Sequence, residues 1–129
     1  MLIMREDQLT LPIANEKGFV DWYVDDFMPE HVADFHQSLD RPTMVKRVTY
    51  ARTLALHFNF KDPVSMTHFV TLMWEIGPNF YTFPGFKEIA EATDQPSMKR
   101  IDRFYDEVTD EQDMAATFGA DENAWNPSN

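Results

Sequence analysis

The sequence predicts an all-α fold, a bundle of five to six helices, on three observations. Apolar residues recur at three- and four-residue steps along most of the chain, which is the spacing of residues on one helix face. Proline and glycine fall between these periodic stretches, where helices begin or end. The 129 residues are 43% hydrophobic and 14% aromatic, which suits the packed core of one domain and leaves no room for a second.

The first two predicted helices lie in the first 40 residues. One runs from about residue 8 to residue 28 and carries an apolar stripe at helical spacing. The stripe consists of Phe19, Val20, Tyr23, Val24 and Phe27. Pro29 can open a short second helix over residues 30–37, with Val32 and Phe35 facing the core.

Two longer helices follow a turn at residues 38–42. The third helix covers about residues 43–58, with Thr43 as its N-cap. Asp62-Pro63 begins a fourth helix, because an acidic cap followed by proline at the first helical position is a strong start signal. Its predicted core residues are Met66, Phe69, Val70 and Met73. Gly77-Pro78 ends this helix, which is the clearest stop signal in the chain.

The last part of the chain contains two predicted helices and a tail. After an aromatic turn at residues 79–83, Pro84 opens a short fifth helix that ends near Ala92. A final helix runs from residue 96 or 97 to about Phe118. Its predicted apolar seam consists of Met98, Ile101, Tyr105 and Val108. Residues 1–118 therefore form the predicted helical domain, and residues 119–129 form a flexible acidic tail.

Composition excludes several classes of function. The chain has 11 basic and 22 acidic side chains and a formal charge of −11, so nucleic acids and anionic membranes would be repelled. It has no Cys for a disulfide or a zinc site, and its 4 Gly do not form a glycine-rich phosphate loop. No stretch approaches the ~20 apolar residues that span a bilayer. Residues 1–4 are too short for a signal-peptide core, so we expect a cytoplasmic protein.

Charge is distributed unevenly along the chain. Residues 41–61 carry 5 basic and no acidic side chains, whereas residues 101–129 carry 1 basic and 8 acidic ones. One interpretation is that the basic third helix pairs with acidic neighbours inside the fold. The other is that an acidic face containing Asp106, Asp110 and Asp113 meets a basic protein partner.

No catalytic, cofactor or metal site is predicted. His31 and His36 are five residues apart, which places them about 140° apart on a helix instead of on one face. Acidic residues are plentiful, but nothing in the sequence marks one as buried, as a general acid or base would need. The serines lack a Gly-x-Ser-x-Gly elbow. We therefore expect a protein that is not an enzyme.

An aromatic run beside the Gly77-Pro78 turn is the most suggestive binding feature. It contains Trp74, Phe80, Tyr81, Phe83 and Phe86. Exposed aromatic side chains would anchor a protein partner, whereas buried ones would fill one end of the bundle core. Trp125 stands apart in the acidic tail, where it could dock in a pocket of a partner or on its own domain.

Four stretches of the chain together resemble the small helical accessory proteins encoded beside type VI secretion effectors. They are RVTYARTLALHF at 47–58, DPVSMTHFVTLMWEIGPNF at 62–80, IAEA at 89–92 and MKRIDRFY at 98–105. The apolar residues 1–4, the following REDQL and the sequence Phe27-Met-Pro-Glu also fit. Two features depart from the family pattern, namely Pro12 inside the first helix and the acidic tail after Phe118.

The resemblance implies an all-α protein found with PAAR-repeat spike-tip proteins, an effector chaperone, a toxic effector and an immunity protein. The implied role is a co-chaperone or adaptor that helps to load the effector on the spike. By position, the residues that match the most recognisable stretch of the family define the fold. These are Leu72, Met73, Gly77, Pro78 and Phe80.

Two functions remain open at this stage. The leading hypothesis is a non-catalytic adaptor that binds a secretion effector or its chaperone through an apolar and aromatic surface. The competing hypothesis is an immunity protein, because small size and a charge of −11 suit the neutralisation of a basic toxin. A homodimer is also conceivable, since the seam of the last predicted helix could pair with a copy of itself.

Overall fold

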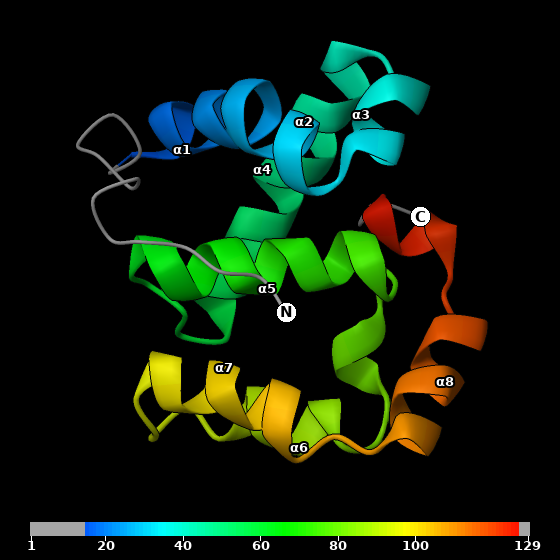
Figure 1. Ribbon diagram of the computed structural model, residues 1–129. Helices are drawn as coiled ribbons and strands as arrows, with labels where there is room; N and C mark the ends of the chain where they lie inside the picture. Colours follow the sequence, from blue (N-terminus) through cyan, green and yellow to red (C-terminus); the bar gives the residue numbers. More distant parts are fainter. Residues whose placement is uncertain (1–14, 127–129) are drawn as a thin grey trace.

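The computed structural model describes residues 15–126, and this part of the chain is helical without strands, as predicted. The helix α5 (Pro63–Glu75) lies in the middle of the molecule, with α1 to α3 on one side and α6 and α7 on the other (Figure 1). The longest helix, α4 (Arg41–His57), crosses behind α5 and packs against it. Over residues 15–126 there is no helix with both the length and the apolar character of a membrane span.

The sequence predicted a break in the first helical run at Pro29, but the run continues through this residue. It consists of α1 (Glu16–Trp22), the π-helical segment η3 (Tyr23–Phe27) and α2 (Met28–His31) without interruption. In η3 the Met28 N–H donates to the Tyr23 carbonyl five residues back, and this wider turn accommodates the proline ring that follows. The break comes instead at Val32, which has φ −136° and ψ 52°. Residues 8–14 of the predicted helix lie outside the described residues.

After this break, α3 (Ala33–Ser38) is short and mostly exposed. Val32 is buried as predicted, but Phe35 is 37% exposed instead of facing the core. Its ring lies 5.2 Å from that of Trp74, so it covers the edge of the core without entering it.

The N-cap of α4 is Asp40, three residues before the predicted Thr43. The Asp40 carboxylate accepts a hydrogen bond from the Thr43 backbone N–H at 2.9 Å. Arg41, at the first helical position, donates to Asp25 at 2.8 Å and to Asp21 at 3.1 Å. These contacts lower the pKa of the Asp25 carboxyl and tie α4 to the first helical run. Part of the basic stretch thus pairs with acidic neighbours inside the fold.

The helix α5 begins and ends where the sequence predicted. Asp62 is its N-cap and accepts from the Ser65 backbone N–H at 3.0 Å, and Ile76 is the C-cap before Gly77. Its buried residues form an unbroken run from Ser65 to Trp74, a wider burial than the predicted apolar stripe. Other helices enclose α5, and its buried hydroxyl and imidazole groups are paired inside the protein, whereas the Trp74 indole N–H has no partner among the described residues. The Thr71 hydroxyl, for example, donates to the Thr67 carbonyl and bonds to the Tyr23 hydroxyl at 2.8 Å.

The elements η4 (Phe80–Thr82), α6 (Phe86–Glu91) and α7 (Ser97–Asp106) close the core below α5 (Figure 1). Pro84 does not open α6, because the helix starts after Gly85, whose φ of 92° suits glycine. An aromatic cluster fills this part of the core, with ring centroids 5.2 to 6.0 Å apart. It consists of Phe60, Phe69, Phe80, Phe86 and Phe104.

The final predicted helix is two helices, α7 and α8 (Asp110–Phe118), separated at residues 107–109. Thr109 starts the second one with a capping box, so the chain changes direction instead of continuing the seam. Ile101 is buried as the seam predicted, whereas Met98 is 38% exposed. Beyond α8 the chain folds back in the turn η5 (Glu122–Trp125), where Trp125 is only 2% exposed. Through residue 126, the predicted tail therefore packs on the domain.

Candidate partner-binding surface

The structure separates the predicted partner-binding residues into two groups. Trp74, Phe80 and Trp125 are buried. Tyr81 and Phe83 are half-buried against the core. The three acidic residues, Asp106, Asp110 and Asp113, are exposed. The aromatic run thus fills one end of the bundle, with Tyr81 and Phe83 partly accessible, and only the acidic residues among the predicted set are fully exposed.

Trp125 is held on its own domain by contacts with Trp74 and Arg47. Its ring lies 4.7 Å from that of Trp74 in α5. The guanidinium of Arg47 in α4 sits 5.3 Å from the Trp125 ring and 5.8 Å from the Trp74 ring, within cation–π range. Arg47 also lies 3.7 Å from the Glu122 carboxylate. These contacts anchor the segment that follows α8.

The other end of α8 is fixed by its capping box. The Gln112 backbone N–H donates to the Thr109 hydroxyl at 3.1 Å, and the Thr109 backbone N–H donates to the Gln112 side chain at 3.0 Å. Gly85 packs directly against Gln112, because a Cβ there would lie only 2.5 Å from Gln112 Oε1. The Gln112 side chain, seated on Gly85, therefore places the start of α8 against the start of α6.

Asn79, in the turn after α5, fastens the end of α8. Its amide nitrogen donates to the Gly119 carbonyl at 3.2 Å, and its amide oxygen accepts from the Asp121 backbone N–H at 3.0 Å. Gly119 contacts the Phe83 ring so closely that a side chain there would overlap it. The helix is thus fastened at both ends to the connection between α5 and α6.

Between these anchors α8 turns an apolar face to solvent. Ala116 is its only buried residue, whereas Met114 is 56% exposed and Phe118 is 82% exposed. At about 100° per residue, Met114 and Phe118 each lie about 160° from Ala116 around the helix. The acidic residues Asp110, Glu111 and Asp113 occupy its first turns. We call Asp110, Glu111, Asp113, Met114 and Phe118 together the α8 surface.

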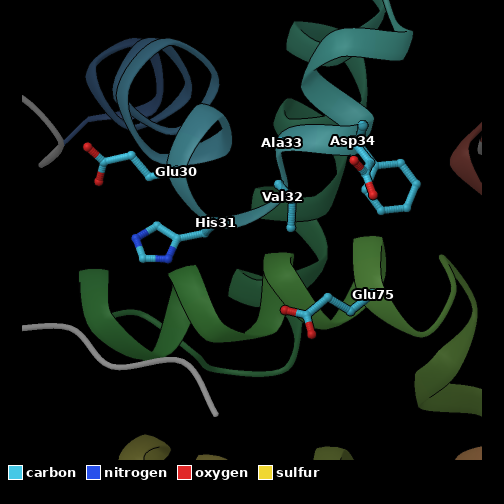
Figure 2. Close-up of a pocket in the computed structure, with 7 residues that line it drawn as sticks. Glu30, His31, Val32, Ala33, Asp34 and Glu75 are labelled. Atoms are coloured by element: carbon cyan, nitrogen blue, oxygen red, sulfur yellow. The ribbon is translucent and has the colours of Figure 1, made fainter.

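A second acidic surface is a pocket of about 520 Å³ between the α2–α3 break and the end of α5 (Figure 2). It is lined by Glu30, His31, Val32, Ala33, Asp34, Phe35 and Glu75. The His31 ring stacks on Phe27 at 4.2 Å, and partial desolvation raises the pKa of the Glu75 carboxyl. Figure 2 shows Glu30 and Glu75 well separated, so the carboxylates do not converge on one point. Over residues 15–126, no cluster of three or more His, Cys, Asp or Glu is placed to hold a metal ion.

Arg100 is a buried charge that the sequence did not single out. It is fully buried in α7 and donates to the carbonyls of Ala90 at 3.0 Å and Asn59 at 3.3 Å. Its guanidinium also lies 4.0 Å from the centroid of the Phe60 ring, and burial lowers its pKa. Because Arg100 bonds one backbone carbonyl in the last turn of α6 and one just beyond the end of α4, its role is to hold the fold together.

Two polar contacts join α5 to α7. Asp62 accepts hydrogen bonds from the hydroxyls of Ser65 and Ser97. Burial alone would raise the pKa of Asp62, but these donors outweigh it and the pKa is lowered. His68 is buried and its Nδ1 pairs with the Tyr105 hydroxyl at 2.9 Å. Both contacts lie at the packed interface of the two helices.

Of the α8 surface, the sequence analysis singled out Asp110 and Asp113 but not Met114 or Phe118. Met114 and Phe118 are four residues apart, which is the spacing of neighbours on a helix. The Thr109-x-x-Gln112 capping box would have placed the start of the helix, but it does not tell which face is covered.

Comparisons of the chain with protein-family models, curated proteins and solved structures find no match.

Proposed function

We propose that this protein is a non-catalytic adaptor or co-chaperone that binds a protein partner through the α8 surface. The observation that carries the proposal is the exposure of Met114 and Phe118 on a helix that packs on Gly85 near its start and is bonded to Asn79 at its end. The resemblance noted in the sequence supplies the partner class, a type VI secretion effector or its chaperone, bound in the cytoplasm before loading.

The chemistry of this surface suits a protein contact. Methionine and aromatic residues are enriched at interfaces, and a polar border commonly surrounds their apolar centre. Covering an exposed Phe or Met side chain contributes ~1.5–3 kcal/mol each, so two such residues can anchor a small interface. The anchors at both ends keep the helix in place before a partner arrives, which lowers the entropic cost of binding.

An immunity protein is the second candidate, and the charge distribution favours it. Residues 101–129 carry 8 acidic and 1 basic side chains, with Asp106, Asp110 and Asp113 exposed. A surface of this charge suits a basic toxin, for which charge complementarity speeds association. The two candidates differ in whether the bound protein stays active.

Affinity purification of the tagged protein from its native cells, at moderate and high salt, tests the proposal. The surface variant is M114S/F118S, and the control is Leu56→Ser, which changes an exposed apolar residue of α4. An adaptor retains a secretion chaperone and an active effector, and only the surface variant loses them. Retention of one inhibited toxin would favour the immunity protein. Equal retention by all three proteins, or none by any, would overturn the α8 contact.

A further inference from the structure

We propose that the α8 surface binds an amphipathic segment with Lys or Arg side chains beside an apolar strip; this inference rests on the proposed function and specifies its partner. Three observations carry it, namely the shape of the apolar ridge, the acidic side chains beside it, and the absence of basic residues on α8.

The apolar part of the surface is a short ridge. Met114 and Phe118 lie one helical turn apart, so their side chains project about 6 Å apart along the helix axis. The nine residues of α8 span about 14 Å at a rise of ~1.5 Å per residue. A partner therefore needs an apolar strip of only two or three side chains, such as one face of a short amphipathic helix.

The acidic part of the surface lacks internal counter-charges. Among residues 15–126, the ion pairs involve Asp21, Asp25, Glu107 and Glu122, and none involves Asp110, Glu111 or Asp113. Near the start of α8 these carboxylates are favoured by the helix dipole, but they remain exposed. Lys or Arg side chains of a partner would supply the missing counter-charge beside the apolar contact.

The α8 helix of a second copy of the chain does not fit this surface. The helix α8 contains three acidic residues and no basic residue. Pairing of two α8 helices would bring like charges together while it buried the Met114–Phe118 ridge, and juxtaposed like charges oppose association. The partner is therefore a different, basic protein segment.

The pocket beside α5 provides a matched comparison for the effect of charge alone. Glu30, Asp34 and Glu75 line it, so it carries the same number of carboxylates as the α8 surface. Its large apolar side chain, Phe35, leans on the Trp74 ring instead of standing free. A partner recognised by charge alone would bind both surfaces, whereas an apolar and basic segment should prefer α8.

The test uses a fluorescent synthetic peptide of about 14 residues, long enough for two faces of a helix, built from Leu and Lys. A peptide with Glu in place of Lys is the control. Binding to the full chain is measured by fluorescence anisotropy at about 50 and 150 mM salt, because screening weakens a charge-assisted contact. We expect the Leu/Lys peptide to bind, more weakly at the higher salt, and the Leu/Glu peptide not to bind.

Three variants then locate the contact. D110N/E111Q/D113N and M114S/F118S should each weaken binding by about tenfold or more, a loss of about 1.4 kcal/mol per tenfold. E30Q/D34N/E75Q makes the same change in net charge and should weaken it less than about twofold. Circular dichroism of each variant checks that the helices remain. Equal losses from the two charge triples, or no loss from M114S/F118S, would overturn the inference, as would failure of the Leu/Lys peptide to bind.

Failure of this inference and failure of the proposed function give different results. If the purified partner is lost on M114S/F118S but the peptide does not bind, the adaptor function stands and the basic chemistry of the partner is wrong. If the peptide binds with the expected pattern but no partner is retained from cells, the basic chemistry stands and the adaptor function is wrong.

Discussion

The helices α5 and α8 are both started by a side-chain N-cap, yet they play opposite roles. Asp62 caps α5 and Thr109 caps α8. Ten of the 13 residues of α5 are buried, against one of the nine in α8. Caps therefore decide where a helix begins, whereas its surroundings decide whether it forms core or surface. The central helix holds the fold, and the peripheral helix is held at its ends and by Ala116.

The largest effect should come from opening a cavity around α5. Phe69 is fully buried, with the rings of Phe58, Phe60, Phe80 and Tyr81 at 5.2 to 6.1 Å. We expect Phe69→Ala to lower the free energy of unfolding by ~3–5 kcal/mol, through lost packing and the cavity left behind. Urea unfolding followed by circular dichroism measures this. A loss below about 1 kcal/mol would contradict the central role of α5.

A smaller and more local effect should follow from removing the anchor of α8. Trp125→Ala removes the ring that packs on Trp74 and Arg47. We expect amide exchange across residues 110–126 to accelerate by about 30- to 100-fold, equivalent to ~2–3 kcal/mol of local stability. Exchange in α5 should change little. Uniform acceleration along the chain would show instead that this anchor supports the whole core.

These two predictions also mark what sequence could and could not reveal. Local signals, such as Asp62-Pro63 and Gly77-Pro78, located α5 because a cap and a stop act on neighbouring residues. The burial of Trp125 could not be read in this way. It depends on contact with Trp74, which is distant in sequence and brought near only by the fold.

The same contrast explains the errors around α8. The apolar positions from Met98 to Val108 suggested one continuous helix, and the capping signal at Thr109 was overlooked. Asp110 and Asp113 were found because charge is visible in the composition of a segment. Phe118 was missed because an apolar residue is exposed only if its side of the helix is left uncovered.

A pH-dependent effect should appear at the interface of α5 and α7. Burial lowers the pKa of His68, against the opposing influence of the Asp102 and Asp62 carboxylates. Unfolded His binds a proton near pH ~6.5, whereas folded His68 does so only at lower pH. The free energy of unfolding should therefore fall as the pH drops from about 6.5 towards the folded pKa.

Urea unfolding between pH 7.5 and 5 measures this dependence. His68→Gln should flatten it, whereas His57→Gln, at the exposed end of α4, should leave it in place. An unchanged slope in His68→Gln would assign the dependence to other groups.

The smallest effect on stability should come from the α8 surface itself. Phe118 is 82% exposed, so Phe118→Ser should change the free energy of unfolding by no more than about 0.5 kcal/mol. The same substitution should weaken partner binding, because it removes a ring that lies free on the surface to contact a partner. Urea unfolding and affinity purification, performed on the same protein, measure the two effects. A large loss of stability would reassign Phe118 to the fold.

Hydrogen–deuterium exchange of the protein, alone and in complex with the partner recovered from cells, locates the contact. We expect slower exchange in residues 110–118 of the complex and no change in residues 30–35 of the pocket. Protection confined to the pocket, with α8 exchanging as fast as in the free protein, would contradict the claim that α8 is the binding surface.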